Sequence, residues 1–412
     1  MRRARLELVL AFVLAAVYGA YLARSGPVMS PDSGWYADAG RALVRGGFRI
    51  GALLDHSPES SLPVFYVGFS YLVAGAQFLF PAHWMLAIAV VNAVSLAATA
   101  YLAMRLVRRA VASRFPVLVV FALFAGMHDQ LQWVPYVLSD STFQLLAFGM
   151  FALTVHGFGA TGGARRYAYF VAAGAGAVAA VFCRPPGLVL CAWILFALAA
   201  APRGEGARGP GLRRVAAGGA VLCAVALLAY AYLMAHGSGL GAPLGPAVEA
   251  VRAGMAGGGV VDARPETSMP PPRHTLDFVA LIGWRLVYFF VFWARGFSTA
   301  HNVVNAAVFV PVYLLAGVAL LSAFSARSRL PRGARDLAVL AAMYVGAVAL
   351  FQALTLLDFD WRYRLPAAPA LIVLAALGSH VLLSARRGPR GPALVMSEAQ
   401  GKIAGFRGAP PE

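Results

Sequence analysis

The sequence predicts an all-α polytopic membrane protein, a bundle of about ten transmembrane helices with interfacial helices on the outer face. Of its 412 residues, 60% are apolar and 12% are charged, and the mean hydropathy is +0.72. Apolar runs close to the roughly 20 residues that cross a bilayer core recur along the whole chain. A soluble chain of this length would need more charge to cover its surface. A membrane β-barrel would show short alternating segments instead.

The basic residues indicate which side of the membrane each loop faces. The formal net charge is +17, which is also typical of nucleic-acid-binding proteins. The arginines, however, form short clusters between apolar runs, as cytoplasmic loops do, and this placement argues against a nucleic-acid partner. The clusters lie at residues 2–5, 105–114, 164–166, 203–214, 327–335 and 386–390. If all of them face the cytoplasm, an even number of crossings separates each cluster from the next.

This parity predicts ten spans, with both termini in the cytoplasm. We expect the protein in the inner (plasma) membrane. The first apolar run is longer than the usual core of a signal peptide, so we expect a retained helix. The expected spans lie near residues 6–23, 84–105, 115–132, 138–156, 167–183, 186–201, 215–235, 302–324, 336–357 and 366–384.

Two apolar segments, 62–80 and 277–297, fall outside this count. Both are rich in aromatic residues, which favour the membrane–water interface, so we expect interfacial or re-entrant helices on the outer face. A twelve-span arrangement in which both segments cross stays open. The transmembrane domain then covers residues 1–385, with outer loops at 25–83 and 236–301, and residues 386–412 form a disordered cytoplasmic tail.

The outer loops hold several of the few acidic residues, and Asp32 begins a predicted helix there. The stretch "SPDSGWYADAG" (residues 30–40) offers Ser30 as N-cap and Pro31 as the first helical residue, and glycines 46 and 47 mark the end. Asp32 then either complements the positive end of this helix or serves as a general base at the membrane surface. Asp140, in "VLSDSTFQLL", is in the same position at the start of a span: it is either a cap or a functional acid that faces a polar cavity.

Two arginines lie on the outer face, where the positive-inside bias disfavours them. Arg184 is in a proline-marked turn, "VFCRPPGLVL", and Arg362 is in "LDFDWRYRLPAAP". Arg362 either forms a salt bridge with Asp358 or Asp360, or the two arginines bind an anionic group such as phosphate, which arginine can hold with two parallel hydrogen bonds.

The histidines and cysteines do not show the spacing of metal ligands. The three cysteines lie within apolar runs, and the histidines of the outer loops are not paired along the sequence. We therefore predict no metal site and assign no cofactor. Whether the protein needs a divalent metal stays open. The residues concerned are Cys183, Cys191, Cys223, His56, His274 and His301.

The order of these segments resembles GT-C glycosyltransferases of the protein-mannosyltransferase (family 39) and aminoarabinose-transferase type, over roughly residues 1–385. The resemblance begins with the acid after the first span, in "D…Y…A..L..G", and the proline–aromatic segment "LPVFYVGFSYLVAGAQFLFPAHW". It continues with the acid in "LSDSTFQLL", then "RPPGL", and ends with "RYRLPAAPALIVLAALG" before the last span. Ser33 stands where many members have a second acid, and the lysine that often precedes a Pro-Pro pair is missing.

The resemblance implies a GT-C-type bundle that moves a sugar from a polyprenyl-phosphate carrier to an acceptor hydroxyl on the extracytoplasmic face. We expect a single inverting displacement without a covalent enzyme intermediate. Asp32 would be the general base and Asp140 a second catalytic acid. Arg184, Arg362 and Tyr363 would bind the carrier phosphate or the sugar. The acceptor would be a lipid, a glycan or a protein. A transporter or flippase for a lipid-linked or anionic solute is the main alternative, and a non-catalytic assembly component is another.

Overall fold

The computed structural model describes residues 5–56, 62–160, 162–200, 228, 230–236, 245–261, 267–356 and 359–386. Within these ranges the regular elements are helices, and β-structure is limited to two isolated bridges. Most of the predicted span 215–235 and the predicted tail beyond Arg386 lie outside the described residues. The helices are α1 (Arg5–Ser25), α2 (Pro31–Arg45), α3 (Ile50–His56), α4 (Leu62–Leu79), α5 (Trp84–Ala110), α6 (Phe115–Gly126), α7 (His128–Leu131), α8 (Asp140–Gly159), α9 (Gly163–Val181), α10 (Gly187–Ala200), α12 (Gly245–Gly254), α13 (Thr275–Phe290), α14 (Thr299–Phe324), α15 (Arg332–Leu354), the 3-10 helix η4 (Trp361–Arg364) and α16 (Ala368–Arg386).

The prediction of a polytopic all-α membrane protein is confirmed. Among the described residues, six helices are long and apolar enough to cross a membrane: α1, α5, α8, α14, α15 and α16. The expected spans near 167–183 and 186–201 correspond to α9 and α10, which fall short of these criteria. The expected continuous span 115–132 is wrong in its extent. Met127 leaves the helical conformation (φ −77°, ψ 91°), so α6 ends at Gly126 and the short α7 follows.

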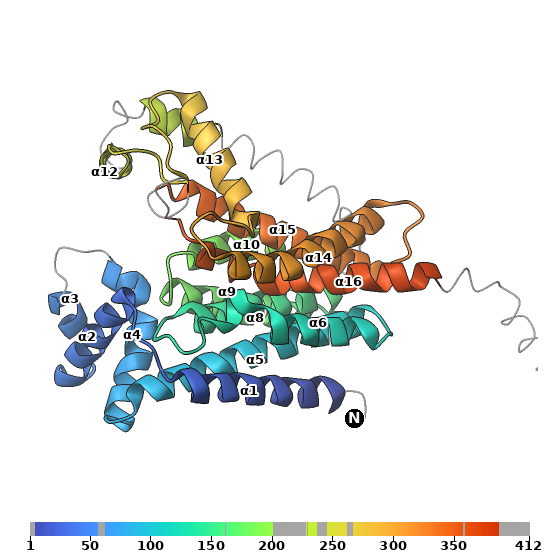
Figure 1. Cartoon of the computed structure of the whole chain (residues 1–412), viewed down its shortest axis with the longest axis horizontal. Helices are drawn as coiled ribbons and strands as arrows, with labels where there is room; N and C mark the ends of the chain where they lie inside the picture. The colour runs from blue at the N-terminus through green and yellow to red at the C-terminus, as the bar shows by residue number, and fades with distance from the viewer. Residues whose placement is uncertain are drawn as a thin grey trace, which may run out of the picture.

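The long helices run alternately up and down, which gives the bundle two chemically different ends (Figure 1). At one end the start of α1 meets the end of α5, where Arg108 lies 3.7 Å from the buried Glu7. We call this the arginine end, because α9, α15 and α16 also begin or end there with arginines. The opposite end carries α2, α3, α4 and α13. Figure 1 shows α4 running across the long helices, the orientation expected of an interfacial helix; whether α4 and α13 lie at the interface stays a prediction.

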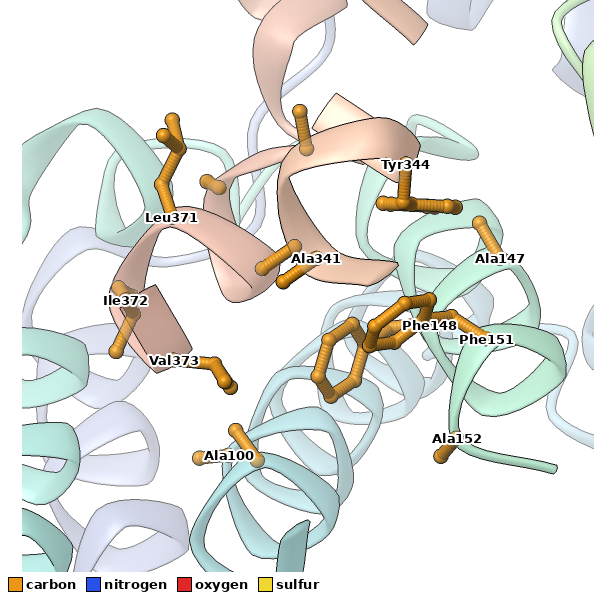
Figure 2. Packing of buried hydrophobic residues seen from close by; sticks show 14 of the residues in the cluster. Ala100, Ala147, Phe148, Phe151, Ala152, Ala341, Tyr344, Leu371, Ile372 and Val373 are labelled. Atoms are coloured by element: carbon orange, nitrogen blue, oxygen red, sulfur yellow. The ribbon is translucent and has the colours of Figure 1, made fainter. Parts of the chain in front are cut away.

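The core of the bundle is built from α5, α8, α15 and α16. Phe148 and Phe151 of α8 lie close to Tyr344 of α15, and small alanines from neighbouring helices fill the space around them (Figure 2). The Tyr344 hydroxyl donates a hydrogen bond to the carbonyl of Pro366 (3.3 Å), which ties α15 to the turn before α16. This rigid packing fixes the end of the bundle to which η4 is attached.

Gly378 of α16 permits a close approach to α14. A Cβ at this position would overlap the backbone carbonyl of Leu315, which cannot move independently of its helix. We expect Gly378→Ala to lower the free energy of unfolding by about 1–3 kcal/mol, as overpacking does. Gly346→Ala in α15 is the matched control, because no atom lies within 4 Å of the added methyl group. Thermal unfolding of both variants in one detergent, followed by tryptophan fluorescence, measures the difference; equal midpoints would contradict the expectation.

Candidate active site

The local sequence fixes the start of α2 as predicted. Ser30 is the N-cap, and its side chain and that of Ser33 each accept a hydrogen bond from the other's backbone amide. Pro31 occupies the first turn, and Gly46 follows the last residue. The segment before the helix is held by Val28, whose amide donates to the carbonyl of Pro135 (2.8 Å) and whose carbonyl accepts from Val137 (3.1 Å). The first turn of α2, which contains Asp32, is therefore fixed beside the segment that leads into α8.

Arg184 is presented by a tight turn between α9 and α10. The amide of Arg184 donates to the Ala180 carbonyl, and Gly187 donates back to the Arg184 carbonyl, both over 2.9 Å. Only glycine fits at position 187, because a Cβ there would overlap the backbone of Val181. The prolines of "RPPG" favour this reversal, since they cannot continue a helix. The α4 helix packs on the same turn, where the amide of Gly68 donates to the carbonyl of Phe182 (2.7 Å).

Arg362 and Tyr363 lie on η4, directly before the last helix. Asp360 caps this 3-10 helix, since its side chain accepts from the backbone amide of Arg362 (3.1 Å). Arg364, the last residue of η4, points the other way into the protein interior. Its Nε donates to the carboxylate of Asp129 in α7 (2.8 Å), and its Nη1 donates to the Val291 carbonyl (2.6 Å).

These three segments meet at a cavity of about 410 Å³ at the end of the bundle away from the arginine end. Arg362 Nη2 lies 2.7 Å from Asp32 Oδ2, which joins η4 to α2. Arg184 forms an ion pair with Asp140 at the start of α8. Both guanidinium groups face the ring of Tyr363, at 5.7 Å for Arg184 and 5.6 Å for Arg362. The cavity is lined by Asp32, Trp35, Tyr36, Tyr66, Leu138, Arg184, Arg362 and Tyr363.

The two ion pairs differ in their contact with solvent. The side chains of Asp140 and Arg184 are 5% and 8% exposed, whereas Asp32 is 51% exposed. Burial alone would lower the pKa of Arg362, but the carboxylates around it outweigh burial and raise that pKa above its usual value. The cavity therefore has fixed cations at its inner wall and a carboxylate at its mouth.

One wall of the cavity is aromatic. The rings of Trp35, Tyr36 and Tyr66 contact one another edge to face, with centroids 5.3–5.8 Å apart. The Tyr36 hydroxyl lies 3.2 Å from the hydroxyl of Ser139, and burial raises the pKa of Tyr36 above its ordinary value, so this hydroxyl stays protonated. Aromatic rings with polar edges, beside charged groups, suit a ligand that has both apolar and hydroxyl-bearing faces.

The predicted site residues Asp32, Arg184, Arg362 and Tyr363 thus line one cavity. Asp140 lies beside it, in a small adjoining cleft shared with Arg184 and the two η4 residues. Asp360, the nearby carboxylate expected as a partner of Arg362, forms only a long ion pair with it, because Asp360 Oδ2 lies 3.9 Å from Arg362 Nε. Asp358 lies outside the described residues. Asp38, the other acid of the opening stretch, pairs with Arg41 on the exposed side of α2.

Several residues of this region carry no distinctive signal in the sequence. Tyr66 and Leu138 carry no pattern that separates them from core or interface residues. Asp129 is one more acid near a helix end, and Arg364 had no predicted role; only the three-dimensional structure pairs them. Trp35 also lines the cavity, but nothing in the sequence separates it from the aromatic residues that favour the membrane–water interface.

Among the described residues, no group of three or more histidine, cysteine, aspartate or glutamate side chains could hold a metal ion. His301 stacks on Phe297 with centroids 4.0 Å apart, and His274 is the N-cap of α13. The side chain of His56, like Cys223, lies outside the part of the chain that is described; Cys183 and Cys191 are free thiols.

No protein-family model matches the chain, and no curated protein matches it. It is similar to a solved structure, the crystal structure of ArnT from Cupriavidus metallidurans in the apo state. The TM-score is 0.49 and the sequence identity 17%, over 92% of this chain and 60% of that chain. The chain therefore spans less than two thirds of the length of that protein, and a function has to be inferred from its own residues.

Proposed function

We propose that this protein is a membrane glycosyltransferase of the GT-C type, which moves a sugar from a polyprenyl-phosphate carrier to an acceptor hydroxyl. The observation that carries the proposal is the contact of Asp32 with Arg362 at a cavity that Arg184 also lines. A carboxylate and two guanidinium groups from distant parts of the chain are the groups that this reaction needs. Residues 1–385 would form the catalytic unit.

The arginines would bind the carrier phosphate. When the bond between the sugar C1 and the phosphate oxygen breaks, the electron pair stays on that oxygen and polyprenyl phosphate leaves with one more negative charge. Fixed donors at such an oxygen are each worth about 3–4 kcal/mol of transition-state stabilisation. Arg184 is held in place by the buried Asp140, which would act as a positioning residue and keep the guanidinium group oriented.

Asp32 would accept the proton of the acceptor hydroxyl while the acceptor oxygen forms the new bond to C1. In the structure Asp32 pairs with Arg362. A carrier phosphate at Arg362 would compete for this guanidinium group and leave the half-exposed carboxylate free to contact the acceptor. One displacement of this kind inverts the configuration at C1 and needs no covalent enzyme intermediate.

The chemical difference between the two ends of the bundle supports one orientation of the protein in the membrane. Arginines gather at the end where α1 begins and α16 ends, and the cavity lies at the other end. Because basic clusters favour the cytoplasm, both termini would be cytoplasmic in the inner membrane, and the cavity would face the extracytoplasmic side.

The proposal is tested with purified protein in liposomes and a panel of polyprenyl-phosphate sugars, each offered with lipid, glycan and peptide acceptors. We expect release of polyprenyl phosphate with at least one donor, and formation of a glycosylated acceptor in equal amount. Binding of the carriers without release by any donor would contradict a transferase. Movement of an intact carrier across the bilayer would instead indicate a flippase.

A further inference from the structure

A second cavity, of about 520 Å³, lies at the arginine end of the bundle. It is lined by residues near the ends of α5 and α8 and near the starts of α9 and α15. Its polar side chains are Arg109, His156, Arg165, Tyr169 and Asp336. The transfer reaction proposed above uses none of these residues.

The charges at this cavity are unbalanced. Nη1 of Arg109 lies 2.6 Å from Nε2 of His156, so the guanidinium group donates to an imidazole rather than to a carboxylate. Arg165 has no hydrogen-bond or ion-pair partner within the described part of the chain. The one lining acid, Asp336, has an interaction of its own. Two guanidinium groups thus face a cavity that a single carboxylate cannot neutralise.

The helix ends add to this positive character. Both α9 and α15 begin at the cavity, and neither has a side-chain hydrogen bond at its N-cap, Gly162 or Pro331. The N-cap residues therefore offer no side-chain acceptor to the first backbone amides of these helices, and the helix dipoles add partial positive charge. Such amides, together with arginines, are the donors that bind phosphate oxygens in proteins.

The cavity also has an apolar wall toward the middle of the bundle, formed by Leu106, Val155, Leu337 and Leu340. A cationic rim above an apolar wall, at the end of membrane-length helices, matches a lipid with a phosphate headgroup.

We infer that this cavity binds a phosphate group, the chemistry that an anionic phospholipid headgroup shares with a free phosphate ion. The site is independent of the transfer reaction and lies at the opposite end of the molecule. Arg109 and Arg165 contact the phosphate oxygens, and the apolar wall accommodates the start of an acyl chain when the phosphate belongs to a lipid.

The test measures binding of phosphatidylglycerol to the purified full-length protein in a neutral detergent, by native mass spectrometry. Diacylglycerol with the same acyl chains is the probe without phosphate. We expect phosphatidylglycerol to bind and R109Q/R165Q to weaken its binding by about tenfold or more, because two charge-assisted contacts are lost. R109K/R165K keeps both positive charges. It therefore tests whether the weaker binding of R109Q/R165Q comes from the lost charges or from the lost arginine shape.

The matched control is R327Q/R329Q, which removes two exposed arginines at the same end but outside the cavity. An equal loss of binding in this control, or unchanged binding in R109Q/R165Q, would overturn the inference, as would equal binding of diacylglycerol. Competition by inorganic phosphate distinguishes the two sources of the phosphate group, a phospholipid headgroup and a free phosphate ion. Displacement of the lipid at millimolar phosphate assigns the site to a free ion, and its failure assigns the site to a phospholipid.

Discussion

Replacing Asp32 with asparagine is expected to reduce sugar transfer by about 10²–10⁴-fold, the contribution of a positioned general base. The asparagine amide has the same shape but cannot accept the proton of the acceptor hydroxyl. The variant should fold, because an ion pair with a half-exposed carboxylate contributes about 0–1 kcal/mol. Donor binding should persist, since Arg184 and Arg362 remain. Initial rates of polyprenyl phosphate release, with donor affinity and thermal unfolding measured on the same preparation, check these expectations.

Asp38→Asn is the matched control for this experiment. Asp38 lies on the same helix six residues later, pairs with Arg41 on the exposed side and does not line the cavity. Its replacement should leave the rate of transfer unchanged. If Asp32→Asn retains wild-type turnover, Asp32 is not the base; if both variants lose activity equally, the loss reflects the helix rather than the carboxylate.

Local features of the sequence predicted the helices well. Ser30, Pro31 and Gly46 delimit α2 as expected, because capping and helix termination depend on the nearest few residues. Apolar runs of membrane length predicted the long helices, because the length and composition of such a run can also be read directly from the local sequence. The break at Met127 was not predicted, although polar residues follow it at 128–130. The ion pair of Asp129 with Arg364, which holds the following turn, joins distant segments and could not be predicted from the local sequence.

The site was predictable only in part. Arg184 and Arg362 stand out because arginine is disfavoured on the predicted outer face, and the two acids stand out because the chain has few near its predicted spans. Which acid pairs with which arginine could not be predicted, because each pair joins distant segments. Arg362 has a near neighbour in Asp360, yet its closer carboxylate is Asp32.

The pair formed by Asp129 and Arg364 is the clearest example of such a non-local contact, and it leads to the second prediction. Both side chains are almost fully buried, and Arg364 also lies over the rings of Phe309 and Trp361 at 4.2 and 4.8 Å. Asp129→Asn would leave a buried guanidinium group without its counter-charge. We expect a loss of about 3–5 kcal/mol in the free energy of unfolding, seen as a lower midpoint of thermal unfolding in detergent.

The pair also holds η4, so its loss should affect the cavity. Arg364 follows Arg362 and Tyr363 directly, and its bonds to Asp129 and to the Val291 carbonyl fix the direction in which those two residues face. D129N/R364M removes the uncompensated charge and should recover part of the stability, but not the position of Arg362; donor affinity should therefore stay below that of the wild type. Glu249→Gln, which removes an exposed carboxylate paired with Arg252, is the control and should change neither quantity. A double variant with wild-type donor affinity would show that the buried pair supports the fold without orienting the cavity, because η4 would then keep its position through its other contacts alone.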